Sequence, residues 1–166
     1  MPTFQTILLA CAATTTALMA GLFYAYFCSV NPGLHRLSDT EYLTAMQSIN
    51  RAILNPIFFI SFIGTPILLP MATWFHYGNP VSLRFWFLLT ATLIYLFGVL
   101  GVTIAGNIPL NEALDSFSIQ KASMDEIAAQ RVKFEAPWNT WNTIRTVASV
   151  VALVFVIMAC ISPKAD

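Results

Sequence analysis

The sequence has little charge and no excess of either sign. Only 10% of its 166 residues are charged, and eight Lys and Arg balance eight Asp and Glu to a formal net charge of +0. An ordinary soluble domain has about 25% charged residues, so the composition excludes a typical water-soluble enzyme domain. Nucleic-acid binding requires a concentrated basic face. A balanced chain with so few charges therefore argues against a nucleic-acid partner.

Metal-binding and redox residues are also scarce, since the chain has two His and three Cys. Cys11, Cys28 and Cys160 lie in or at the ends of apolar runs and form no CxxC pair, so we expect neither a disulfide nor a redox pair. His35 and His76 fall on opposite sides of the membrane in the topology derived below. Because they cannot jointly bind a metal or a haem, we expect no metal and no cofactor.

Apolar sequence is abundant, at 57% of residues with a mean hydropathy of +0.70. Four runs approach the roughly 20 residues that a helix needs to cross about 30 Å of hydrocarbon. They cover residues 4–30, 53–75, 85–106 and 143–161. Backbone groups in lipid must be satisfied within the segment, which favours helices over strands. The predicted fold is all-α, an integral membrane four-helix bundle that forms a single domain over residues 1–166.

The first apolar run differs from a cleaved signal peptide. It has no basic n-region, and it continues through Tyr24 and Phe27 without a small-residue cleavage site. We interpret it as a retained first span. The chain is therefore expected to be a multi-pass protein embedded in the lipid bilayer, in the inner or plasma membrane if it is bacterial.

Successive spans run in opposite directions, which sorts the connections between the two sides. Residues 31–52 and 107–142 lie on one side, and residues 76–84 lie on the other side with both termini. The side with the long connections holds most of the Lys and Arg, and the positive-inside rule favours the cytoplasm for it. Most of the acidic residues lie there too, so the orientation stays open.

The third connection has a helical pattern over residues 110–136. Leu110, Leu114 and Phe117 recur at helical spacing, with charges between them. We expect an additional helical segment here. It would either lie over the bundle as one or two surface helices or act as a lid over a site.

Polar side chains concentrate where the second and fourth spans begin. In a helix through residues 47–56, four polar residues share about 140° of one face: Gln47, Asn50, Arg51 and Asn55. In a helix through residues 138–145, four residues share about 100° of one face: Trp138, Trp141, Asn142 and Arg145.

A third polar element, containing Asn107 and Asn111, ends the third span on the same side. Single residues of these types have structural explanations, since Trp anchors head groups, Arg snorkels and Asn caps helices. Polar groups that enter a membrane span are nevertheless costly and are functional candidates. Three such elements at one level predict a polar pocket that suits a flat, oxygen-bearing aromatic or quinone-like ligand.

The same segments resemble the signatures of the anthrone oxygenase-like family of small four-helix membrane proteins. The resemblance is carried by QSIN at 47–50 with NP at 55–56, by GNIPLN at 106–111 and by WNTWNTIRT at 138–146. It covers nearly the whole chain, from the first span to Ser149. Bacterial members mostly carry a domain of unknown function. Fungal polyketide-pathway members convert an anthrone to an anthraquinone, and their C-terminal motif differs from the WNxxR version here.

The resemblance implies cofactor-independent oxygenation of an anthrone-like or other phenolic substrate, because the deprotonated substrate can react directly with dioxygen. The residues implied in catalysis are Arg145 and Arg51, which stabilise the oxyanion, and Asn142, which orients the oxygens of the substrate. Those implied in substrate binding are Asn50, Asn55, Asn107, Asn111, Trp138, Trp141 and Gln47. The general base stays open among His35, Glu112 and Glu135.

Two other functions fit the sequence. A non-catalytic membrane protein could bind a quinone-like or lipid molecule, or support a neighbouring complex, without turnover. A purely structural four-helix protein would use the polar cluster to hold its helices together. Transport is less favoured, because the chain has no internal repeat and no charged residue at mid-span.

Overall fold

The computed structural model describes residues 3–78 and 80–163, which form helices and short links with no strand in those ranges. Four helical segments are long and apolar enough to cross a membrane: Phe4–Leu34, Pro56–Phe75, Leu83–Ser116 and Met124–Ile161. These observations confirm the all-α four-helix membrane fold. The chain is a multi-pass membrane protein.

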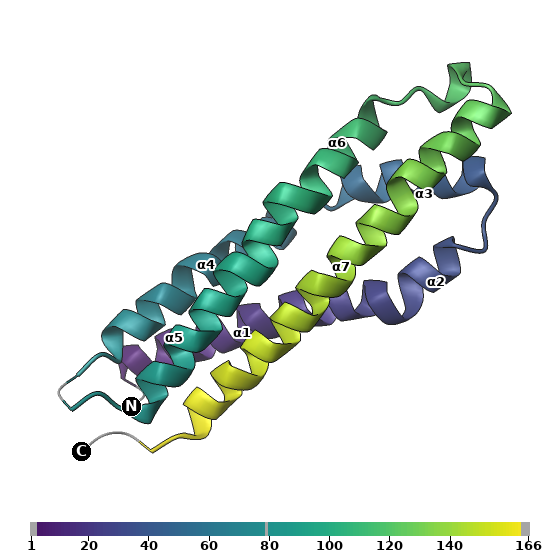
Figure 1. Cartoon of the computed structure of the whole chain (residues 1–166). Coiled ribbons are helices and arrows are strands. Elements are labelled where there is room, and N and C mark those ends of the chain that lie inside the picture. The colour runs from purple at the N-terminus through teal and green to yellow at the C-terminus, as the bar shows by residue number, and fades with distance from the viewer. Residues whose placement is uncertain (1–2, 79, 164–166) are drawn as a thin grey trace.

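Two of the long segments contain π-helical turns. The first consists of α1 (Phe4–Ala25), η1 (Tyr26–Val30) and α2 (Asn31–Leu34). The third consists of α5 (Leu83–Tyr95), η2 (Leu96–Gly101), η3 (Thr103–Asn107) and α6 (Ile108–Ser116). The remaining elements are α3 (Asp39–Ala52), α4 (Pro56–Phe75), the 3₁₀ turn η4 (Ile119–Lys121) and α7 (Met124–Ile161). In Figure 1, α1 begins and α7 ends at the end of the bundle that carries the α4–α5 turn, as the predicted topology requires.

The long helices differ in length. At 1.5 Å per residue, α4 is about 30 Å long, which matches the hydrocarbon layer, whereas α7 is about 57 Å long. The excess lies at the end away from the α4–α5 turn (Figure 1). The third connection is helical as predicted, but its helices continue the spans instead of forming separate surface helices. Ser123 and Glu126 form a capping box that starts α7 at Met124, well before the apolar sequence begins.

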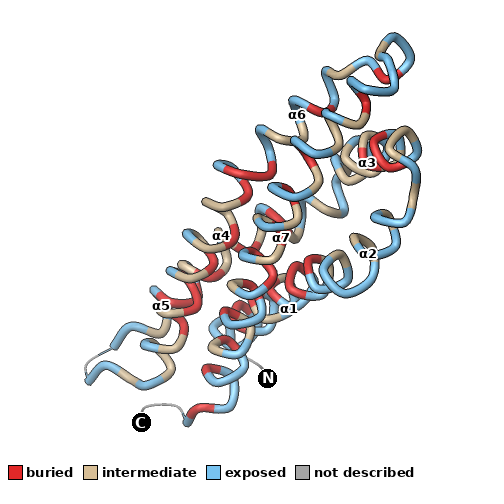
Figure 2. The backbone as a smooth tube through the Cα atoms, turned by 45° about the vertical axis from the view of Figure 1, so that its right-hand side comes forward, coloured by how far each residue is buried: buried red, intermediate tan, exposed pale blue. Residues whose placement is uncertain are grey.

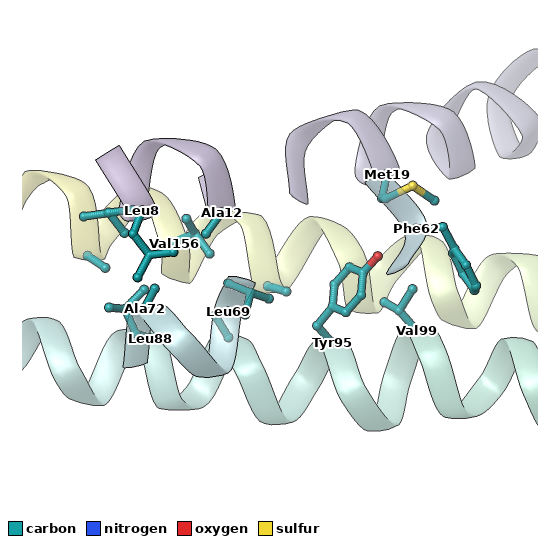
Figure 3. Packing of buried hydrophobic residues seen from close by; sticks show 14 of the residues in the cluster. Leu8, Ala12, Met19, Phe62, Leu69, Ala72, Leu88, Tyr95, Val99 and Val156 are labelled. Carbon is teal, nitrogen blue, oxygen red and sulfur yellow. The ribbon is translucent and has the colours of Figure 1, made fainter. Parts of the chain in front are cut away.

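The membrane part has a tightly packed core. Figure 3 shows Leu8, Leu69, Leu88 and Val156 packed between the helices, with Tyr95 further along the bundle. Small residues such as Ala12, Ala72 and Ala91 let the helices approach closely. The buried residues lie on the inward faces of the helices in Figure 2. The outward faces remain apolar because they contact lipid.

A second core lies beyond the membrane part, where α3 packs on α6 and α7. Its buried side chains are Tyr42, Leu43, Met46, Leu114, Ile119, Ile127, Phe134 and Trp138. In Figure 1, α3 runs across the bundle instead of along it. This helix therefore covers the end of the membrane part, above the start of α4.

The junction between α3 and α4 corrects the prediction of one helix through residues 47–56. α3 ends at Ala52, and Asn55 adopts an extended conformation with φ −131° and ψ 159°. Pro56 disfavours the helical conformation for the residue before it. Asn55 instead caps α4, since its Oδ1 accepts a hydrogen bond from the Phe58 backbone N–H at 3.1 Å. The second span accordingly begins at Pro56, later than predicted.

Candidate functional site

A cavity of about 130 Å³ lies where α1 and η1, the α3–α4 junction, η3 with α6, and α7 meet. Its apolar lining is Leu22, Phe23, Ile49, Ile53, Leu54, Phe58, Phe59, Phe62 and Ile108. Its polar or amphipathic lining is Tyr26, Asn50, Thr103, Asn107, Asn111, Trp138 and Arg145. The cavity thus brings together predicted site residues from all three polar elements.

Arg145 supplies a buried cation to this cavity. The residue is only 8% exposed, and its Nε and Nη2 donate to Asn142 Oδ1 at 3.2 and 3.1 Å. Its guanidinium carbon lies 4.5 Å from the Phe23 ring centroid and 5.2 Å from that of Trp138. No Asp or Glu oxygen of residues 3–78 and 80–163 lies within 4.0 Å of the guanidinium. Aromatic faces compensate a cation only partly, so the described residues around Arg145 do not neutralise its charge.

The cavity also contains amides whose hydrogen bonding is incomplete. Asn107 Nδ2 donates to the Trp138 carbonyl at 3.4 Å, but its Oδ1 is buried without a partner among the described residues. Asn50 Nδ2 is likewise buried without a hydrogen-bond partner among the described residues. Buried polar groups are normally hydrogen-bonded. These two amides therefore have unused hydrogen-bonding capacity in the cavity lining.

Trp138 is held in place by neighbouring groups. Its Nε1 donates to Asn111 Oδ1 at 2.8 Å, and its ring centroid lies 5.7 Å from that of Tyr26. Asn111 therefore orients the indole as well as lining the cavity. The result is an aromatic wall beside the guanidinium of Arg145.

π-helical turns place some of the lining residues. Tyr26 begins η1, while Thr103 and Asn107 begin and end η3. A π turn inserts an extra residue into a helical turn and shifts the face on which later side chains lie, and such turns are frequent at functional sites. Asn107 has helical φ and ψ and makes no side-chain capping bond, so it does not act as a helix cap.

Five of the predicted site residues lie outside the cavity lining although they are close in sequence to it. Gln47 Nε2 donates to the carbonyls of Leu114 and Phe117 at 2.8 and 2.9 Å, which joins α3 to the end of α6. Arg51 is an exposed ion-pair partner of Asp115 at 2.6 Å. Asn55 is the cap described above.

Trp141 is the fourth of these residues, and it packs against Gly106. A Cβ atom at Gly106 would come within 2.6 Å of the indole ring, so any other residue there would force the indole to shift. Asn142 is also absent from the lining, but its side chain positions Arg145, which does line the cavity.

The candidate bases lie in two places. His35 Nδ1 and Glu135 Oε1 are 2.7 Å apart, and Glu135 also accepts from Arg131 Nε at 2.7 Å. This group lies in the N-terminal part of α7, beyond the apolar sequence of the span. Glu112 instead lines a hollow that adjoins the cavity and shares Asn50, Leu54 and Asn111 with it.

Arg131 connects this outer group to α3. Its Nη1 donates to Asp39 Oδ1 at 2.9 Å and to the Leu37 carbonyl at 2.7 Å, and its guanidinium lies over the Tyr42 ring. Burial, with a contribution from the Glu135 charge, raises the pKa of Tyr42. These contacts fix α3 on α7 above the cavity.

The sequence model of the anthrone oxygenase family matches residues 57–155, more than half of the chain. The chain belongs to the anthrone oxygenase family. The match includes Asn107, Trp138 and Arg145 of the cavity and begins after α3. No curated protein and no solved structure matches.

This member of the anthrone oxygenase family has site residues that the sequence did not reveal. Tyr26, Phe23 and Thr103 line the cavity but lie within uniformly apolar runs. In the sequence, only the hydroxyl groups of Tyr26 and Thr103 distinguish these positions from the apolar residues around them. Among residues 3–78 and 80–163, no three His, Cys, Asp or Glu side chains are grouped as metal ligands would be.

Proposed function

We propose that the protein oxygenates an anthrone-like or other phenolic substrate, which binds in the cavity as an anion beside Arg145. The main support is the buried guanidinium of Arg145, which has a neutral amide and two aromatic rings around it but no carboxylate among the described residues. Membership of the anthrone oxygenase family supports the choice of substrate class.

The reaction needs only the substrate and dioxygen. Removal of one proton from the methylene of an anthrone leaves an electron-rich anion. One electron passes from this anion to dioxygen, and the two radicals combine to form a carbon–oxygen bond. Protonation gives a hydroperoxide, and loss of water leaves a carbonyl. One dioxygen is consumed and one water is formed for each anthraquinone.

The residues around the cavity have distinct roles in this proposal. Arg145 stabilises the substrate oxyanion, an interaction that strengthens in a site from which water is excluded. The amides of Asn50 and Asn107 orient the oxygen atoms of the substrate. Asn142 positions Arg145, and Trp138 provides the face against which a ring packs.

Glu112 is the proposed proton acceptor. It lines the hollow that shares three residues with the cavity, whereas Glu135 is already bonded to His35 and Arg131. An acceptor can act through one bridging water. A proton leaving the substrate would reach the aqueous side by this route.

The experiment measures dioxygen uptake by the purified protein in lipid nanodiscs with anthrone as the substrate. The Arg145→Gln variant should reduce turnover by about a hundredfold, as loss of an oxyanion-stabilising group does in other enzymes. Lys133→Gln is the matched control, because it removes an exposed cation from the same helix. Equal turnover in the wild type and Arg145→Gln would contradict the proposed role of Arg145.

A second candidate function is binding of a quinone-like ligand without turnover. It is favoured by the cavity volume of about 130 Å³, which accommodates about one quinone ring, and by apolar walls that carry a few polar groups. This function predicts saturable binding of a quinone without dioxygen uptake. The same nanodisc preparation distinguishes the two candidates.

A further inference from the structure

The cavity is open on an apolar side. Three of its lining residues are exposed, and all three are apolar: Leu54 at 65%, Phe59 at 41% and Ile108 at 38%. We call these residues the rim. Every polar residue in the lining is buried or half-buried. Leu54 also borders the adjoining hollow that contains Arg51, Glu112 and Asp115, so the cavity has an apolar side at the rim and a polar side at that hollow.

The rim lies at the level of the hydrocarbon boundary. α4 begins at Pro56 and has the length of the hydrocarbon layer, so Leu54 lies near the boundary and Phe59 about one helical turn inside it. Arg145 lies about 24 Å along α7 from its last residue, Ile161, which also places it a short way inside the layer. The side chain of Ile57, beside the rim, is 82% exposed and faces lipid.

The size of the cavity limits what it can enclose. An engineered cavity of about 150 Å³ binds benzene, and the volume here is about 130 Å³. The space beside Arg145 therefore holds about one aromatic ring. Any larger ligand must extend out of the cavity through the rim.

We propose that the cavity takes one phenolic ring of a membrane-dissolved molecule, while the apolar remainder of that molecule stays in lipid between Leu54, Phe59 and Ile108. The ring reaches the cavity sideways from the bilayer. The proposal rests on the proposed function in taking the bound group to be a phenol, but it requires no turnover. On the aqueous side, the Arg51–Asp115 ion pair lines the adjoining hollow.

Photolabelling tests this route without depending on oxygenation. The protein is reconstituted in phosphatidylcholine vesicles with 4-dodecylphenol that carries a diazirine on its alkyl chain. Labelled positions are then mapped by mass spectrometry. The label should fall on the rim residues or their immediate neighbours, and unlabelled 4-dodecylphenol should displace it.

Two pairs of variants provide the comparison. Leu54→Trp and Ile108→Trp fill the rim, and each should reduce labelling about tenfold, equivalent to about 1.4 kcal/mol of binding free energy. Ile57→Trp and Ile104→Trp add the same bulk at exposed neighbouring positions outside the lining and should leave labelling unchanged. If one of the two rim variants fails to fold, the other still tests the route.

The outcomes separate this proposal from the proposed function. Unchanged labelling in both rim variants, or an equal loss in rim and control variants, overturns lateral access. Loss confined to the rim variants supports it even if no dioxygen is consumed. Dioxygen uptake with unaffected labelling would retain the oxygenase and overturn only the route.

Discussion

Asn142 lies one helical turn before Arg145 on α7, and its Oδ1 accepts hydrogen bonds from both Nε and Nη2 of the guanidinium. Because the acceptor is a neutral amide, it fixes the direction of the side chain without cancelling its charge. A carboxylate at the same place would fix the guanidinium equally well but would leave no net cation for a ligand.

The first prediction follows from this relationship. Asn142→Asp should keep the fold but weaken binding of an ionised phenol about tenfold, because the new carboxylate competes with the ligand for Arg145. Thr140→Asp is the control, since it adds a charge at an exposed position of the same helix. Titration of the purified variants with 4-nitrophenolate measures both. Unchanged affinity in Asn142→Asp would show that Arg145 is not the anion site.

The second prediction concerns proton transfer. Glu112→Gln should lower the turnover number about a hundredfold, as loss of a general base does, with little change in substrate affinity. Asp115→Asn removes a different carboxylate from the same hollow and should leave turnover within about twofold of the wild type. Steady-state dioxygen uptake gives both values. Equal effects of the two substitutions would point to the charge of the hollow instead of a base at Glu112.

The third prediction concerns the contact between Gly106 and Trp141. Gly106→Ala places a Cβ atom 2.6 Å from the indole and should destabilise the fold by about 1–3 kcal/mol. Gly21→Ala meets no heavy atom within 4 Å and should be neutral or slightly stabilising. Thermal unfolding followed by circular dichroism compares the two. Adding Trp141→Leu to Gly106→Ala should recover part of the loss, and failure to do so would place the strain elsewhere.

The fourth prediction contrasts two arginines in ion pairs. Arg51→Gln removes an exposed pair and should cost about 0–1 kcal/mol of unfolding free energy. Arg131→Gln breaks a half-buried group that binds Asp39, Glu135 and backbone carbonyls, and it should cost more, about 1.5–3 kcal/mol. Unfolding in low and high salt should show strong screening only for the Arg51 pair. Similar costs for both variants would contradict the difference in burial.

The fifth prediction is a pH dependence at the start of α3. Hydrogen bonds from the Ser38 side chain and backbone lower the pKa of Glu41. A folded-state pKa below the unfolded value stabilises the protein above the unfolded pKa, and this contribution is lost as the pH falls through the lowered value. Glu41→Gln should reduce the free energy of unfolding at neutral pH. It should also remove the share of the stability loss at low pH that comes from protonation of Glu41. Asp125→Asn is the exposed control, and unfolding between about pH 2 and 7 is the measurement.

Part of the site was predictable because it depends on local sequence. The segments around Asn50, Asn107 and Arg145 were identified as polar elements at one membrane level, and the structure places all three in one cavity lining. Within each segment, however, a shared helical face about 100° wide does not show which side chains line a cavity and which pack against a neighbouring helix. Trp138 lines the cavity, while Trp141, on the same predicted face, packs on Gly106.

The sequence by itself determined the membrane environment, the four spans and the helical character of the third connection, because hydropathy, length and helical spacing are properties of local chain segments. Tertiary structure alone decided which arginine is left without a carboxylate. Arg51 and Arg145 look alike in the sequence, but α6 brings Asp115 to Arg51, whereas Asn142 and two aromatic rings surround Arg145. The neighbours of a charge depend on segments far apart in the chain, and no local pattern contains that information.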